Sequence, residues 1–255
     1  MIFSGFANTL CYVQHFDLQT RDPLLFQNHP VLRSYSLKQI LQDSKSNRCL
    51  LKGLTNPILR KYKYQQQSEN MNEQLKSILP SERIDELLSI GRIKSMKASE
   101  YFIHAGDVPD KVAFVGSGLF RYVYTNSRGD EFTKGIIPEN FFLSSYSAMI
   151  MGKPSYFSIE ALEDSQLLEI DWPDFNQLKD NDIFWLKFLL KFVERGYIIK
   201  EKRERDLLLL DAETRYRNFF TEFPGMDQRI RQGIIASYLG IQPETLSRIR
   251  RKIIF

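Results

Sequence analysis

The most informative part of the sequence lies near its C-terminal end and reads Gln232-Gly-Ile-Ile-Ala-Ser-Tyr-Leu-Gly-Ile-Gln-Pro-Glu-Thr-Leu-Ser-Arg-Ile-Arg-Arg-Lys252. Two helices that cross at a tight turn need a small residue at the crossing and a residue that tolerates positive φ in the turn. Ala236 and Gly240 supply them. Pro243 suits the first turn of the second helix, where a missing N–H costs nothing. Apolar residues at helical spacing would hold the pair together: Ile235, Leu239, Ile241, Leu246 and Ile249. The stretch predicts a helix-turn-helix.

The second of these helices would expose a polar face with the chemistry of major-groove recognition. Glu244, Arg248 and Arg251 follow one another at spacings of four and three, so they share one face. A guanidinium can donate to guanine O6 and N7 together, and a carboxylate can accept from cytosine N4. Four neighbouring polar side chains suit contacts to phosphates: Thr245, Ser247, Arg250 and Lys252. The alternative is an ordinary helical hairpin with a solvated basic face.

Turn-forming clusters divide the preceding sequence into short segments. Residues 104–109, 116–118, 126–130 and 138–140 hold the Gly, Pro, Asn and Asp residues typical of turns. The segments between and after them are rich in Val, Ile, Leu, Phe and Tyr and predict strands at residues 112–115, 119–125, 131–137, 156–162 and 167–170. Many short strands at this spacing predict an antiparallel barrel or roll.

Two helices are predicted around the roll. A short one runs to residue 90, with Ser81 as its N-cap and Gly91 as its stop. A long one, over residues 181–210, lacks proline and carries two apolar stripes at helical spacing. The stripes are Ile183, Leu186, Leu190, Val193 and Tyr197, and Trp185, Leu189, Phe192 and Ile199. We expect one stripe to lie on the roll and the other on a second copy, as a homodimer. The alternative is a helix enclosed within one larger monomer.

These patterns predict four parts of the chain: residues 1–70, a β-roll sensor domain at 71–180, a dimerisation helix at 181–210, and a helix-turn-helix domain at 211–255. The first part shows no sustained period and is expected to be a poorly ordered extension, or a start assigned too far upstream of Met71. A small accessory domain is the alternative. Residues 1–70 hold nine Lys and Arg against four Asp and Glu, so they account for the positive net charge of +4. The net charge of the chain is therefore weak evidence for DNA binding. From Met226 onward there are six basic residues against two acidic ones.

Composition argues against several classes of protein. No apolar run approaches the roughly 18 residues of a membrane span, and residues 1–16 lack the pattern of a signal peptide. A cytoplasmic protein without a membrane partner is expected. The three His and two Cys match no catalytic or metal-binding spacing, so neither an enzyme nor a cofactor is expected.

Residues 236–250 resemble the Crp/Fnr family of bacterial transcription regulators, and the order of predicted elements from Asn72 to Ile253 is similar to that family. The resemblance implies an α+β fold: an N-terminal antiparallel β-roll of the cyclic-nucleotide-binding type, a long dimerisation helix and a C-terminal winged helix-turn-helix. It implies double-stranded DNA as a partner and contact with RNA polymerase. Glu244 and Arg248 match two base-reading residues of the family, whereas Pro243 replaces a third, an arginine. A wing is expected from residues 228–232.

The expected effector region departs from the family pattern. Family members that bind cyclic AMP carry a Gly-Glu pair and an arginine that pairs with the cyclic phosphate. The resemblance places Ser144 and Ser145 at the pair and Ser155 or Tyr156 near the arginine. Because a buried anion needs a counter-charge, cyclic AMP binding in the standard mode is not expected. Lys153 is a nearby cation, although its Gly and Pro neighbours are typical of an exposed turn. The effector is expected to be an uncharged or apolar small molecule, a partner protein, or absent.

Two further residues are candidate ligands of an effector or cofactor. Glu160 could bind a ligand hydroxyl, but an edge-strand position that faces solvent is expected. His104 is expected to be structural rather than a haem ligand, and the region of resemblance has no cysteines for an iron-sulfur cluster. The leading function is therefore sequence-specific DNA binding. The competing hypothesis is a ligand-binding or scaffold module whose helical tail contacts protein.

Overall fold

The computed structural model describes residues 56–253 of the 255-residue chain. The chain divides into two units, residues 1–66 and 67–255. Helix α5 (Asn56–Leu75) runs through the boundary predicted at residue 70, so residues 56–70 are helical rather than irregular. Its Lys, Gln and Glu residues favour a helix even without an apolar period. Met71 and Leu75, at its end, are buried in the core of the second unit. The predicted extension before residue 56 lies outside the described residues.

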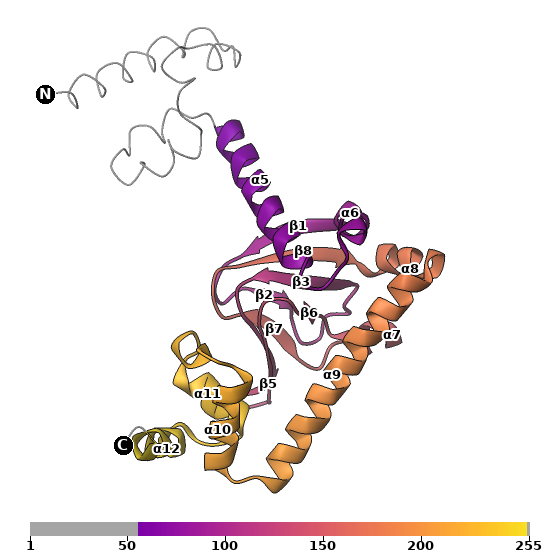
Figure 1. The fold of residues 1–255 in the computed structure, drawn as a ribbon. Coiled ribbons are helices and arrows are strands. Elements are labelled where there is room, and N and C mark those ends of the chain that lie inside the picture. The colour runs from indigo at the N-terminus through magenta and orange to yellow at the C-terminus, as the bar shows by residue number, and fades with distance from the viewer. Residues whose placement is uncertain (1–55, 254–255) are drawn as a thin grey trace, which may run out of the picture. The chain divides into compact units, whose positions relative to one another are not determined.

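The predicted roll is confirmed as two four-stranded antiparallel sheets (Figure 1). One sheet has the order β1 (Gly91–Met96), β8 (Ser165–Asp171), β3 (Lys111–Ser117), β6 (Phe142–Leu143). The other has the order β2 (Tyr101–Ile103), β7 (Ser158–Ala161), β4 (Phe120–Thr125), β5 (Glu131–Ile137). Apolar side chains from both sheets form the core of the roll, among them Val115, Phe120, Ile159 and Leu167.

All five predicted strands are present, and three were missed. β1 and β2 are mostly exposed or half-buried, so their sequences lack the apolar content that marked the others. β6 has only two residues. Helix α7 (Tyr146–Met151) follows β6, and helix α8 (Trp172–Asn181) follows β8.

Helix α6 (Ser81–Ile90) and helix α9 (Ile183–Leu209) lie near the predicted bounds. Ser81 was wrongly predicted as an N-cap: it is the first helical residue, and Pro80 takes the cap position without a side-chain hydrogen bond. Asp182 caps α9 by accepting from the Phe184 N–H. Trp185 of α9 is fully buried, and its Nε1 donates to Glu86 of α6 at 2.9 Å. This contact joins α9 to α6.

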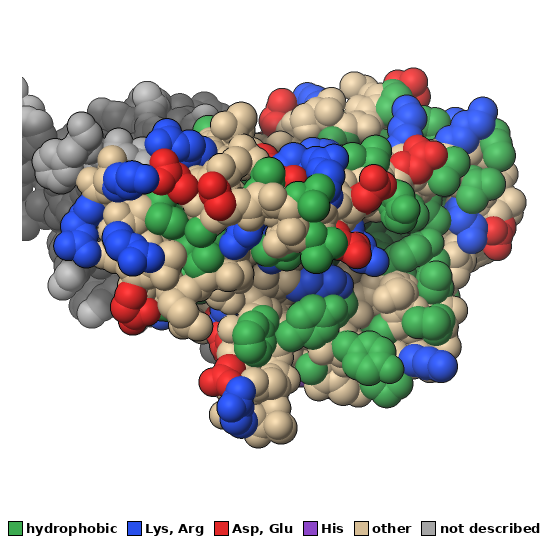
Figure 2. Space-filling view, turned by 90° about the horizontal axis from the view of Figure 1, so that it is seen from below, with side chains coloured by type: hydrophobic (Ala, Val, Ile, Leu, Met, Phe, Trp, Pro, Cys, Tyr) green, Lys and Arg blue, Asp and Glu red, His purple; other side chains and the backbone are tan. Residues whose placement is uncertain are grey.

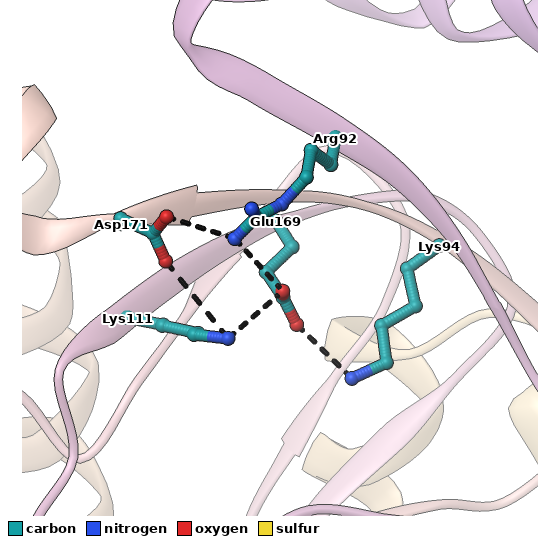
Figure 3. Close-up of polar contacts among 5 residues, drawn as sticks. All are labelled: Arg92, Lys94, Lys111, Glu169 and Asp171. Atoms are coloured by element: carbon teal, nitrogen blue, oxygen red, sulfur yellow. Dashed lines mark hydrogen bonds and ion pairs between the residues drawn. The ribbon is translucent and has the colours of Figure 1, made fainter.

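Ion pairs join three neighbouring strands of the first sheet, β1, β8 and β3 (Figure 3). Glu169 of β8 is almost buried and accepts from Lys94 of β1 at 3.0 Å and from Lys111 of β3 at 3.2 Å. Arg92 and Asp171 extend the network at 2.8 Å. Burial of Glu169 would raise its pKa, but the hydrogen bonds from the two lysines hold the pKa below its usual value. The carboxylate thus stays ionised and ties three strands together.

The C-terminal region forms the predicted helix-turn-helix. It consists of helix α10 (Ala212–Glu222), the 3-10 helix η2 (Met226–Gln228), helix α11 (Gln232–Leu239) and helix α12 (Pro243–Ile253). Ala236 is fully buried and Gly240 has a φ of 67°, as the sequence predicted. The prediction of a wing at residues 228–232 is wrong. The described residues 211–253 contain no strand, and residues 226–228 form a helical turn instead.

Candidate functional site

Helix α12 presents the predicted polar face to solvent. Leu246 and Ile249 are buried against α10 and α11, and this orients the opposite side outward. The side chains of Glu244, Arg248 and Arg251 are exposed. Figure 2 shows basic side chains gathered at one end of the face seen from below. Among residues 65–252, no hydrogen bond or ion pair engages the three side chains of α12. They are therefore available to a ligand.

The expected phosphate-contacting residues are placed less uniformly. Ser247 is exposed, whereas Thr245 and Arg250 are half-buried. Lys252 donates to Glu213 of α10 at 2.9 Å, which turns its ammonium toward the protein. Because the Lys252 side chain is 73% exposed, this pair is weak and can exchange for a phosphate.

The helix-turn-helix packs on the roll of the same chain. Leu119 and Ile136 of the roll belong to the same buried cluster as Phe219 and Leu239 of the C-terminal helices. The Thr133 N–H of β5 donates to Ser237 Oγ of α11 at 2.8 Å. A displacement of β5 would therefore also displace α11.

Arg229 forms a second link between the two parts, which we call the Arg229 bridge. Its guanidinium donates to Glu139, which follows β5, at 2.6 Å and to Glu163, which follows β7. Burial pushes the pKa of Glu139 upward, but hydrogen bonds from Arg229 and from the Gly118 N–H hold that pKa below its usual value. The bridge therefore favours the ionised carboxylate.

We expect Arg229→Met to destabilise the chain by about 1 kcal/mol, since the partners are half-exposed and screened by water. A lowered folded-state pKa stabilises the fold above the unfolded-state pKa, and this stabilisation is lost as the pH falls through the folded value. The wild type should thus lose stability more steeply than Arg229→Met below about pH 5. Urea unfolding across this pH range measures both. Equal slopes would show that the bridge contributes nothing.

The expected effector residues come together only in part. Ser155 Oγ lies 2.8 Å from Ser145 Oγ and donates to the Phe157 carbonyl at 2.7 Å. Ser144 Oγ donates to the Lys111 carbonyl at 2.9 Å. The Ser145 and Ser155 side chains are buried, and all three hydroxyls are engaged in hydrogen bonds within the chain. Tyr156 is 81% exposed and stands apart from them.

The two charged candidates near these serines differ from each other. Lys153 lies exposed in the turn after α7, as predicted. The prediction that Glu160 faces solvent from an edge strand is wrong: β7 lies between β2 and β4, and the Glu160 side chain is 12% exposed. Arg121 of β4 donates to Glu160 at 2.6 Å and also to Glu131 of β5. The carboxylate is committed to this internal pair.

Sequence reasoning missed a group of aromatic residues around Lys134 of β5. Its Nζ lies 3.7 Å from the centre of the Phe157 ring, 5.5 Å from that of Tyr122 and 5.7 Å from that of Tyr124. The usable signal was the alternation of Tyr122 and Tyr124 along one strand, which puts both rings on one face. His104 lies in an exposed turn beside Tyr101. Within the described part of the chain, no group of His, Cys, Asp and Glu is arranged to hold a metal ion.

One apolar stripe of α9 has no partner among the residues that the structure describes. Its residues are exposed by 38% to 64%: Ile183, Leu186, Leu190, Val193 and Tyr197. The other stripe faces the roll through Trp185, Leu189 and Phe192, but Ile199, assigned to it from the sequence, is 45% exposed. Hydrophobic side chains are also exposed on the face drawn in Figure 2. None of the described helices is long and apolar enough to span a membrane.

Comparisons with known proteins agree with this architecture. Residues 93–182 match the family described as cyclic nucleotide-binding domain. No curated protein sequence matches the chain. The structure is similar to that of FixK2 from Bradyrhizobium japonicum, with 17% identity and a TM-score of 0.57 over 64% of this chain and 84% of that one.

Two other solved structures are similar. The c-di-GMP responsive global regulator CLP of Xanthomonas campestris has 14% identity and a TM-score of 0.59 over 68% of this chain and 91% of that one. A transcriptional regulator of the CRP/FNR family from Thermus thermophilus has 17% identity and a TM-score of 0.54, over 64% of this chain and 86% of that one. The chain therefore contains a cyclic nucleotide-binding domain and has the fold of the Crp/Fnr transcriptional regulators.

Proposed function

We propose that this protein is a transcription regulator that binds double-stranded DNA sequence-specifically through α12. The observation that carries the proposal is the exposed face of α12, where Glu244, Arg248 and Arg251 have no partner within residues 65–252. The helix is the second of a helix-turn-helix, which is the element that such domains place in the major groove. Arg248 would bond guanine and Glu244 would accept from cytosine.

The phosphate contacts are assigned to the side chains around this face. Ser247 is exposed, and Lys252 becomes available when its weak pair with Glu213 opens. Thr245 and Arg250 are half-buried and would reach phosphates at the rim of the groove. These contacts add affinity that falls with salt but do not select a sequence.

The regulator is proposed to act as a homodimer. The exposed stripe of α9 repeats at spacings of three and four from Ile183 to Tyr197, the pattern of a helix that pairs with its copy. Two subunits would then present two α12 helices to successive major grooves about 34 Å apart. The operator is therefore expected to be palindromic. Contact with RNA polymerase is part of the same proposal.

Cyclic AMP is not proposed as the effector in the standard mode. Ser144, Ser145 and Ser155 bring no positive charge to the expected phosphate site, and their hydroxyls bond to the protein itself. We expect saturating cyclic AMP to change the affinity for the operator by less than about twofold, because an unpaired buried phosphate is strongly disfavoured. Fluorescence anisotropy with and without the nucleotide measures this. A change of about tenfold or more would restore cyclic AMP as the effector.

Selection of bound duplexes from a random pool tests the proposed function. The full chain is incubated with the pool at fixed salt, and the bound fraction is sequenced over several rounds. We expect one palindromic motif to be enriched. Binding that depends on salt but selects no motif would instead favour a scaffold whose basic helix contacts other partners.

A further inference from the structure

Lys134 is a cation held in an apolar setting without a counter-charge. Its Nζ lies over the Phe157 ring and faces Tyr122 and Tyr124. Phe157 is 5% exposed, so the ammonium lies at a mostly dry surface. Among the described side chains, no carboxylate forms an ion pair with Lys134. Cation–π contacts offset only part of the loss of hydration.

Two acidic side chains on strands of the same sheet are committed elsewhere. Glu131, on the same strand, and Glu160, on β7, both accept from the buried guanidinium of Arg121. Moving either carboxylate to Lys134 would leave Arg121 short of a partner, which is costly in a buried position. The chain therefore does not supply the missing anion from these strands.

A second cation lies on α9, one helical turn before Arg203, whose guanidinium donates to the carbonyl of Thr133, the residue before Lys134, at 3.1 Å. Lys200 is exposed and belongs to no ion pair among residues 65–252. Burial first, and the charge of Lys200 second, lower the pKa of Lys134 to about 8. The ammonium groups of Lys134 on β5 and Lys200 on α9 repel each other. An anion bound between them would reduce this repulsion.

The same place adjoins the residues expected to form the effector region. Tyr122 Oη accepts from the Ser144 N–H at 3.4 Å, and Phe157 follows directly on the segment of Ser155 and Tyr156. Tyr122 is half-buried and Phe157 buried, so rings flank the cation on the roll side, while Lys200 approaches from α9. An occupant would thus contact both the roll and the long helix.

We propose that Lys134 and Lys200 bind a small organic anion whose apolar or aromatic body packs beside the rings of Tyr122 and Tyr124. Carboxylates, sulfonates and phosphates share the chemistry that the two ammonium groups recognise, and the rings select for an apolar body over a sugar. The proposal names the effector class of the sensor domain and so rests on the proposed function. It replaces the expectation of an uncharged effector.

Binding of two matched probes tests the proposal without DNA. The first is 8-anilinonaphthalene-1-sulfonate, and the second is uncharged N-phenyl-1-naphthylamine, which has the same rings. We expect Lys134→Met to weaken sulfonate binding about tenfold, as for loss of one charge-assisted hydrogen bond, and to leave the neutral probe unchanged. Lys200→Met should act in the same direction. Lys153→Met, which removes the exposed cation near the serines, is the matched control and should have no effect.

The pH dependence provides a second readout. The sulfonate binds the ammonium form, so its affinity should fall as the pH rises from about 7 to about 9.5 through the pKa of Lys134. The other groups that face this site are Tyr122, whose pKa burial raises to about 12, Tyr124, Lys200, and Arg203 of α9, which donates to the Thr133 carbonyl. Lys134→Arg keeps the charge throughout and should bind with a flatter profile.

Either of two results would overturn the proposal. One is equal sulfonate affinity for wild type and Lys134→Met at about pH 7. The other is a neutral probe that binds as tightly as the sulfonate and loses affinity in the same variants. If Lys134→Met does not fold, the comparison of Lys134→Arg with wild type across pH decides the question. Failure here leaves DNA binding by α12 untouched, because the duplex selection is measured separately.

Discussion

Leu186→Glu combined with Leu190→Glu is expected to halve the molecular mass in solution and to weaken operator binding on the order of 100-fold or more. Both leucines lie in the exposed stripe of α9, with 45% and 52% of their surface uncovered in the single chain. The changes should therefore spare the fold of the subunit but place charges in the interface of a dimer. A monomer binds one half-site and loses the gain from linking two.

The control for this pair is Lys187→Gln combined with Lys191→Gln. Both lysines are exposed on α9 outside the stripe, and the change in net charge is the same. Light scattering measures the molecular mass, and fluorescence anisotropy measures the affinity for the operator. A stripe variant that stays dimeric would show that α9 is not the interface. A monomer with unchanged affinity would show that dimerisation does not serve DNA binding.

Trp185→Ala is expected to destabilise the chain by about 3–5 kcal/mol, the range for removal of a large buried aromatic side chain. Trp185 is fully buried among Phe175, Phe184 and Phe188, and its indole N–H donates to Glu86. The variant leaves a cavity at the point where α9 leaves α8 and meets α6. It should therefore loosen the long helix as well as lower the melting temperature.

Urea unfolding followed by circular dichroism measures the loss. Phe184→Ala, at the preceding and only half-buried residue, is the matched control and should cost clearly less. Trp185→Phe should recover most of the stability because it keeps a ring in the core. Similar losses for Trp185→Ala and Phe184→Ala would mean that Trp185 does not anchor α9.

The sequence predicted the C-terminal domain best because several local requirements agree there. Local backbone geometry, which does not depend on distant contacts, requires the residue types found at Ala236, Gly240 and Pro243. The stripe of α9 that faces the roll was found for a similar reason, since a 3.6-residue period reports burial directly. Ile199 was assigned to the same stripe as Trp185 but is exposed, because the period does not show which residues of a stripe the roll covers.

The sensor domain was harder to predict. Glu160 was expected in solvent because the order of strands is not local information, and only the sheet reveals that β7 has a neighbour on each side. The partner that commits it, Arg121, lies 39 residues away in sequence. Lys134 was missed for the same reason: the strands, the loop and the helix around it meet only after folding.

Recognition of bases by α12 is tested most directly with the variant Arg248→Ala. Its affinity is measured at fixed salt for the selected palindrome and for a scrambled duplex. Lys97→Ala, which removes an exposed cation from the roll, controls for charge. We expect Arg248→Ala to lose about 1–3 kcal/mol per half-site on the palindrome and little on the scrambled duplex, and Lys97→Ala to lose little on either. Equal losses on both duplexes, or a loss no larger than that of Lys97→Ala, would contradict base recognition by this helix.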